Sequence, residues 1–427
     1  MSNISELKKR ISFTILALLV YRLGTFIPIP GINSEALKSF FATKAGMFDM
    51  INMFSGGALE RMSIFALSIV PYITASIIMQ LLSSMYKGLE TLKKEGEYGR
   101  AKINQYTRYL TIILALFQSV GIYYSMAYGD KNLFISDSKI FLYTTCISLV
   151  GGTVILMWLG ERIVTSGIGN GISMIIFVGI VSSLPSTIVE TFSLLRSGAY
   201  SGFGVMMFFV SFVLLLAGIC YVEKLHKRIK AFHSSNRSTS HLTGSENSTF
   251  IPLKINIAGV IPPIFASSIL TFPIILAQVF GIRSEFVIGI LDRGSWQYIS
   301  IFSVLIIFFC YFYSSILLNT TEIADNLKKG NCFIPGVRPG STTAQYLDSI
   351  IMRLTFIGAL YLIIVCTLPE IAVRNYSFPL HMGGTGILII VNVVLDLVAQ
   401  IQSHMMSYKY STASGGVRMR RRVIRKR

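Results

Sequence analysis

The chain has 427 residues, of which 52% are hydrophobic and only 14% are charged, and its formal net charge is +18. A soluble domain carries about 25% charged residues, so this composition excludes an ordinary water-soluble protein. The five cysteines lie far apart without a CxxC pair, which indicates neither a disulfide framework nor a zinc site. We find no nucleophile with a partner base, and therefore predict no catalytic residues, no metal and no cofactor.

Runs of about 20 apolar residues recur along the whole chain, and each is long enough to cross a hydrocarbon layer as a helix. In lipid the backbone must satisfy its own hydrogen bonds, so these runs should be helical. The first run exceeds a signal-peptide core and should remain as the first helix. The sequence thus predicts an all-α polytopic membrane protein with ten transmembrane helices. The predicted spans are 11–30, 63–85, 107–128, 139–160, 168–190, 203–222, 255–279, 297–319, 351–372 and 383–406.

Basic residues mark cytoplasmic loops, because they resist translocation. They are concentrated in alternate connections, from Lys87 to Lys102, Lys224 to Lys230, Lys328 to Arg338 and Arg418 to Arg427. Because the number of spans is even, both termini should face the cytoplasm. This bias explains most of the net charge without nucleic acid, and a basic cytoplasmic face suits anionic lipid or an acidic partner.

The first external connection, from Met47 to Arg61, is neither a clean span nor a polar loop. It carries an apolar cluster that ends at Ser55-Gly56-Gly57. This pattern fits a short half-helix that dips back toward the membrane. Such irregular backbone survives at depth only inside protein or beside a water-filled cavity. An amphipathic helix at the interface is the alternative that the residues leave open.

The glycine-rich run Gly167–Gly171 is similar to a phosphate-binding loop, but no strand precedes it, so we predict a close turn that opens the fifth span. Gly383–Gly386 should do the same before the tenth span. Ionisable residues inside the spans are few, and we interpret them as polar groups at helix ends or helix contacts: Arg22, Glu161, Glu370 and Asp396. Because they form no relay, an ion-coupled transporter is disfavoured. A membrane scaffold without a transport role is the second alternative.

Two cytoplasmic connections are unusually long, 223–254 and 320–350. The first is rich in Ser, Asn and Thr around its middle, which is typical of a solvated tip between two ordered ends. The second holds Arg338 between Pro335-Gly336 and Pro339-Gly340, which fix the backbone. Such an arginine is either a presented contact or part of a solvated face, and the pattern favours neither.

Isoleucines recur four residues apart in two spans that begin with a Pro or Gly irregularity, as Ile73 and Ile77 and as Ile172 and Ile176. Each pair shares one helix face, which ordinarily meets lipid or a neighbouring helix. If these faces converge instead, they form an apolar constriction that excludes water and ions by dewetting.

Several long motifs together resemble the SecY family of protein-translocation channels. They include Met53-Phe54-Ser55-Gly56-Gly57-Ala58-Leu59, then Ser63–Leu67 and Pro71–Leu82. Further matches are Lys94–Glu97, Gln105–Tyr109, Trp158–Glu161, Gly167–Ser173, Leu253–Ser268, Ala324–Gly340 and Met382–Gln400. The resemblance covers nearly the whole chain in the right order.

The resemblance implies two pseudo-symmetric five-helix halves around a central pore with a re-entrant plug. On this chain they are residues 1–195, with the plug near 47–61, and residues 196–406, with the loops 223–254 and 320–350. A basic cytoplasmic tail follows at 407–427. A gate between the second and seventh spans would release signal sequences and membrane helices into lipid.

The resemblance also implies site residues. The pore ring would consist of Ile73, Ile77, Ile172, Ile176, Ile261 and Ile389. The plug would be Met53, Phe54, Ser55, Gly56, Gly57, Ala58, Leu59, Glu60 and Arg61. Docking of a motor or ribosome would use Arg338, Lys328, Lys329, Lys227 and Arg228.

The implied partners are the membrane subunits SecE and SecG, the motor ATPase SecA, the ribosome, secretory preproteins and the lipid bilayer. The implied location is the bacterial cytoplasmic (inner) membrane, and the implied function is that of a passive protein-conducting pore and not an enzyme. The chain departs from the family in the 223–254 loop, where a Ser- and Asn-rich stretch replaces the usual basic and aromatic segment. Its tail is also richer in arginine, and binds ribosomal RNA or lipid, or is only solvated.

Overall fold

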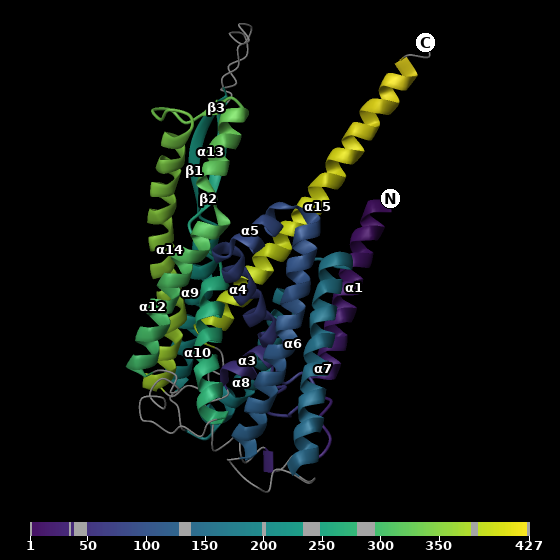
Figure 1. Ribbon diagram of the computed structural model, residues 1–427, viewed down its shortest axis with the longest axis vertical. Helices are drawn as coiled ribbons and strands as arrows, with labels where there is room; N and C mark the ends of the chain where they lie inside the picture. Colours follow the sequence, from purple (N-terminus) through teal and green to yellow (C-terminus); the bar gives the residue numbers. More distant parts are fainter. Residues whose placement is uncertain are drawn as a thin grey trace. The chain divides into compact units, whose positions relative to one another are not determined.

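The computed structural model describes residues 2–33, 36–37, 49–127, 138–198, 202–233, 248–279, 295–376 and 383–424. The chain is mainly helical (Figure 1). The elements are α1 (Ser2–Gly24), α3 (Asp49–Ser55), α4 (Val70–Met85), α5 (Lys87–Lys94), α6 (Glu97–Ala127), α7 (Ser138–Ser166), α8 (Gly171–Arg196), α9 (Gly202–Glu223), β1 (His226–His233), β2 (Ser248–Lys254), α10 (Ile261–Val279), α12 (Trp296–Leu317), α13 (Thr320–Lys329), β3 (Cys332–Phe333), α14 (Ser341–Tyr376) and α15 (Gly384–Ile424).

The predicted spans are confirmed as helices in the part of the chain that the structure describes. They correspond to α1, α4, α6, α7, α8, α9, α10, α12, α14 and α15. By length and composition α6, α7, α8, α9, α12, α14 and α15 can cross a membrane, while α4 and the start of α10 are shorter apolar helices. Large apolar side chains such as Phe203, Val213 and Leu214 on α9 are exposed. A surface of this kind suits lipid, because in water it would be an aggregation-prone patch.

In two spans the helix begins well after the predicted start. The second span was expected from residue 63, but α4 begins at Val70 with Pro71 in its first turn. Ser68 just before it has φ of +51°, which a right-handed helix cannot contain. The seventh span was expected from residue 255, but α10 begins at Ile261. Here Gly259 has φ of +64° and donates its N–H to Asn256 Oδ1 at 3.1 Å, which closes a turn ahead of the helix.

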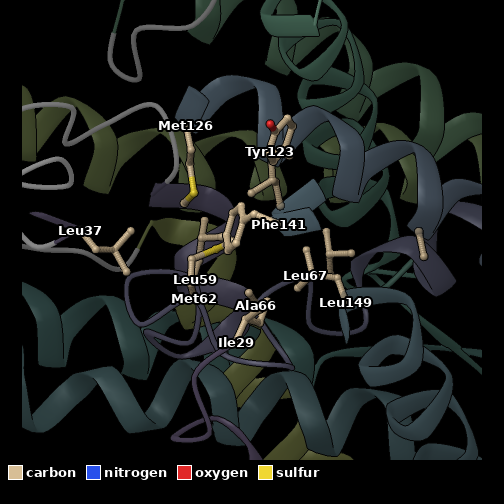
Figure 2. Close-up of a cluster of buried hydrophobic side chains, with 12 residues drawn as sticks. Ile29, Leu37, Leu59, Met62, Ala66, Leu67, Tyr123, Met126, Phe141 and Leu149 are labelled. Carbon is tan, nitrogen blue, oxygen red and sulfur yellow. The ribbon is translucent and has the colours of Figure 1, made fainter. Parts of the chain in front are cut away.

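The chain divides into two compact units. Unit 1 is Met1–Glu190 with Pro273–Val287 and Ile389–Arg427, and unit 2 is Thr191–Phe272 with Ile288–Leu388. The expected division into halves at residue 195 stays a prediction. In unit 1, α6 packs against α4 and α7, and α7 packs against α1. Figure 2 shows the apolar cluster that α6 and α7 form with the segments after α1 and before α4. Its buried members are Ile29, Leu37, Leu59, Met62, Ala66, Leu67, Ala115, Ile122, Tyr123, Met126, Phe141 and Leu149.

In unit 2, α12 packs against α14, and a buried hydrogen bond of 2.9 Å from Thr355 Oγ1 to Ser314 Oγ joins them. The strands form an antiparallel sheet in the order β2–β1–β3, with Ile229 of β1 opposite Ile251 of β2. An apolar cluster joins the sheet to α14 through Ile229, Leu253, Ile334, Leu347, Ile351 and Leu354. The sheet confirms the two ordered ends expected for the 223–254 loop. The middle of that loop, 234–247, lies outside the described residues.

Candidate functional site

The segment Met53–Arg61, here called the plug segment, begins in the last turn of α3 and then folds back on itself. Gly56 and Gly57 have φ of +65° and +80°, which only glycine adopts readily, so they end the helix. The N–H of Gly57 returns to the carbonyl of Asn52 at 3.1 Å. The side chain of Asn52 donates to Glu60 Oε1 at 2.6 Å across the resulting turn. The local sequence therefore produces a short helix with a tight reversal, as predicted.

Most of the plug segment is buried inside unit 1. Met53, Phe54, Ala58 and Leu59 are all buried, and Leu59 belongs to the cluster in Figure 2. After the segment, the chain pairs with the residues that follow α1. The N–H of Ile29 bonds the Met62 carbonyl at 2.9 Å, and the N–H of Ile64 bonds the Ile27 carbonyl at 3.1 Å. An amphipathic helix at the membrane interface, the alternative left open by the sequence, does not match this burial inside unit 1.

The predicted ring residues lie in the N-terminal halves of their helices. Ile77 on α4, Ile176 on α8 and Ile389 on α15 are buried, and Ile73, Ile172 and Ile261 are partly buried. Five of the six lie in unit 1, and Ile261 lies in unit 2. Convergence of the six side chains on one constriction stays a prediction.

The run Gly167–Gly171 forms the close turn that the sequence predicts between α7 and α8. Gly169 has φ of +88°, and a Cβ on Gly171 would collide with the carbonyl of Gly160. The turn's N–H groups have side-chain partners. Thr14 Oγ1 accepts from Ile168 at 3.0 Å, and Gln400 Oε1 accepts from Gly169 at 2.9 Å. Because the N–H groups of Ile168 and Gly169 already have partners within the protein, we assign this turn a role in packing and not in phosphate binding.

Arg338 lies at the tip of a turn whose two ends are fixed. Gly336 and Gly340 have φ of +80° and +112°, and Thr343 Oγ1 donates to the Arg338 carbonyl at 2.8 Å. On the preceding side, Ile334 is buried in the cluster under the sheet and Val337 packs against it. The Arg338 side chain itself is exposed. The backbone is thus anchored while the guanidinium is presented to solvent.

The other predicted docking residues are exposed at two places in unit 2. Lys328 and Lys329 end α13, and Lys227 and Arg228 lie on β1. Among the described residues, no group of three His, Cys, Asp or Glu side chains could hold a metal ion.

Comparison with known proteins decides the family. The SecY family model matches residues 63–398. The protein translocase subunit SecY of Rickettsia typhi is 49% identical over 413 residues, covering 95% of this chain and 95% of that protein. The corresponding subunit of Escherichia coli K12 is 45% identical over 419 residues, covering 96% of this chain and 94% of that protein. The chain belongs to the SecY family.

Solved structures share the SecY fold. A structure described as that of a protein-conducting channel matches with a TM-score of 0.70 at 17% identity, covering 94% of this chain and 93% of that one. A second solved structure matches with a TM-score of 0.68 at 18% identity. It covers 94% of this chain and 93% of that one. Its description says that the plug domain of that SecY protein stabilises the closed state of the translocation channel and maintains a membrane seal.

Sequence reasoning missed the residues that hold the plug segment of this SecY chain. Tyr21 and Ser68 donate hydrogen bonds to it, and Arg22, interpreted above as a helix-contact group, does so as well. Their separations of 34, 14 and 34 residues from their acceptors leave no local pattern. Glu161 on α7, also interpreted above as a helix-end group, forms an ion pair with Arg108 on α6. Arg108 donates from Nε to Oε1 at 2.9 Å and from Nη2 to Oε2 at 2.6 Å.

Proposed function

We propose that this chain is the channel subunit of a bacterial protein translocase. Unfolded secretory polypeptides pass through it across the cytoplasmic membrane, and signal sequences and membrane helices leave it sideways into lipid. The observation that carries the proposal is its identity of 45 to 49% over nearly its full length with proteins named protein translocase subunit SecY. The chain acts as a passive pore and not as an enzyme.

The charge pattern supports an orientation with both termini in the cytoplasm. The loops that carry Arg338, Lys328 and Arg228 then lie on the cytoplasmic side, where the motor ATPase SecA and the ribosome act. A solved Sec61 structure described as part of a ribosome–channel complex resembles this chain with a TM-score of 0.64. SecE and SecG complete the channel in the membrane.

Transport itself tests the function. Vesicles that contain the chain with SecE and SecG, supplied with SecA and ATP, should protect a signal-bearing preprotein from added protease. Vesicles without the chain should protect none, because the lipid alone cannot pass a hydrated polypeptide. If the chain is folded and inserted yet protects no preprotein beyond the empty vesicles, the proposal is wrong.

The plug segment and the isoleucine ring have separate tasks in this channel. The ring of Ile73, Ile77, Ile172, Ile176, Ile261 and Ile389 forms an apolar constriction. Because it offers no hydrogen bonds, it fits around any side chain while resisting water and ions. The plug segment, Met53–Arg61, closes the pore at rest.

Replacing Ile73 or Ile261 with Asn should raise export of a reporter with a defective signal sequence about tenfold, because a polar side chain lets water wet an apolar constriction. The control is Ile78→Asn on α4, which changes the same residue type on a different helix face from Ile73 and Ile77. Reporter export is measured in intact cells. Background export in both ring variants, or an equal rise in the control, would remove the ring assignment.

A further inference from the structure

Three successive backbone carbonyls at the end of α3 accept hydrogen bonds from side chains outside the plug segment. Ser68 Oγ donates to the Phe54 carbonyl at 3.0 Å, and the Tyr21 hydroxyl donates to the Ser55 carbonyl at 3.4 Å. Arg22 Nη1 donates to the Gly56 carbonyl at 3.1 Å. The last carbonyls of a helix have no partner within the helix, so buried ones need donors from elsewhere. Here α1 and the segment before α4 supply them.

The same end of α3 lies so close to α8 that neither Gly56 nor Gly179 could carry a side chain without a clash. A Cβ on Gly56 would lie 2.6 Å from Ser182 Oγ and 2.7 Å from the Gly179 carbonyl. A Cβ on Gly179 would lie 2.6 Å from the Phe54 carbonyl and 3.2 Å from the Tyr21 hydroxyl. The facing glycines therefore let the two backbones approach, and this approach brings the carbonyls of α3 within reach of Tyr21.

Arg22 is held ready for its acceptor by its own surroundings. Its Nη1 also donates to Thr25 Oγ1 at 3.4 Å, and the Thr25 hydroxyl donates back to the Arg22 carbonyl at 2.6 Å. Its guanidinium lies 4.9 Å from the centre of the Phe26 ring. Arg61, at the far end of the plug segment, lies 4.3 Å from the centre of the same ring. The Phe26 ring, just after α1, thus contacts Arg22 on α1 and Arg61 at the end of the plug segment through cation–π interactions.

We propose that Tyr21 and Arg22 form a latch on α1 that holds the plug segment in its seat, and that Arg22 is the positioning residue that sets how often the segment leaves. The inference rests on the proposed role of Met53–Arg61 as a plug. Tyr21 and Arg22 belong to α1 and their acceptors to the plug segment, so both of these bonds must break when the segment moves away. A hydrogen bond from a charged donor in a partly buried site is stronger than a neutral one, so Arg22 contributes more than Tyr21.

The latch is tested by labelling a cysteine that only plug movement exposes. Ala58 is fully buried, so Ala58→Cys in the otherwise complete channel reacts with a soluble maleimide only when the segment leaves its seat. Labelling at position 58 is measured by peptide mass spectrometry, which keeps the five native cysteines separate. Arg22→Gln should raise this rate about tenfold and Tyr21→Phe about threefold, because they remove a charged and a neutral hydrogen bond. Arg22→Lys, which keeps the charge, should restore most of the protection.

Two controls separate a latch from general loosening. Arg10→Gln removes the same charge from α1, where Arg10 bonds Glu6 on the same helix at 3.1 Å, and it should label position 58 at the starting rate. The native Cys310 is buried in unit 2, and its labelling should not change in any variant. The latch is wrong if Arg22→Gln and Tyr21→Phe leave position 58 protected, or if Cys310 becomes exposed in parallel. The plug role would fail separately, if deleting residues 53–61 left the resting conductance of the channel unchanged.

Discussion

Deleting residues 53–61 should give a folded channel that leaks ions, with a resting current about tenfold or more above that of the intact chain. The seal would then rest on the isoleucine ring alone, and an apolar constriction closes only by dewetting. The measurement is steady conductance in planar lipid bilayers. A variant in which a Gly-Ser linker of equal length replaces the segment should leak as well, because it keeps the chain length but removes the buried side chains.

The deleted chain should still fold. Of the apolar cluster that α6 and α7 form with the segments after α1 and before α4, only Leu59 belongs to the plug segment, so the other members remain in contact. Within that cluster the loss is one buried leucine, about 2 to 5 kcal/mol. The buried side chains of Met53, Phe54 and Ala58 are removed with the segment as well. The backbone pairing of Ile29 with Met62 and of Ile27 with Ile64 lies outside the deletion. Unchanged conductance in a variant that keeps its protease-resistant core would show that the segment is no plug.

The helices could be predicted from the sequence because lipid permits few alternatives. A long apolar run has to satisfy its own backbone, so hydropathy alone located the spans. The start of α4 could not be located in this way, since residues 63–69 are as apolar as the helix that follows them. What prevents an earlier start is Ser68, whose backbone takes a positive φ and whose side-chain hydroxyl donates to the Phe54 carbonyl. That conformation depends on a contact 14 residues away.

The sheet of β1, β2 and β3 could not be predicted from the sequence for a different reason. In β1, Ile229 and Ala231 are buried while Arg228 and Lys230 are exposed, which is the alternation of a strand with one face covered. The run is short and strongly basic, and the sequence therefore indicated an ordered end of a cytoplasmic connection without its strand. The anchoring of Arg338 followed from the same sheet, because Ile334 packs beneath it with Ile229 and Leu253. The Pro-Gly pairs indicated a rigid tip, but not what the tip rests on.

Arg338→Glu should abolish SecA-driven translocation while leaving the channel folded and inserted. The native fold uses the backbone carbonyl of Arg338, which accepts from Thr343, and leaves the side chain exposed. An exposed charge contributes little to stability, so reversing it should not unfold the loop. Because the anchored turn holds the guanidinium in place, binding a carboxylate or phosphate there loses little conformational entropy. Reversal at such a contact costs about 2 to 5 kcal/mol, which is more than about thirtyfold in affinity.

The measurement is protease protection of a preprotein in vesicles that carry the variant, beside a proteolysis check on folding. Lys254→Glu is the matched control, because it reverses an exposed charge on β2, in the sheet that packs over Ile334, at a position outside the fixed turn. It should transport at close to the normal rate. Arg338→Lys should be intermediate, since it keeps the charge but loses the planar pair of donors. Normal translocation by Arg338→Glu would remove the docking role, and loss of the folded fragment would make Arg338 a structural residue instead.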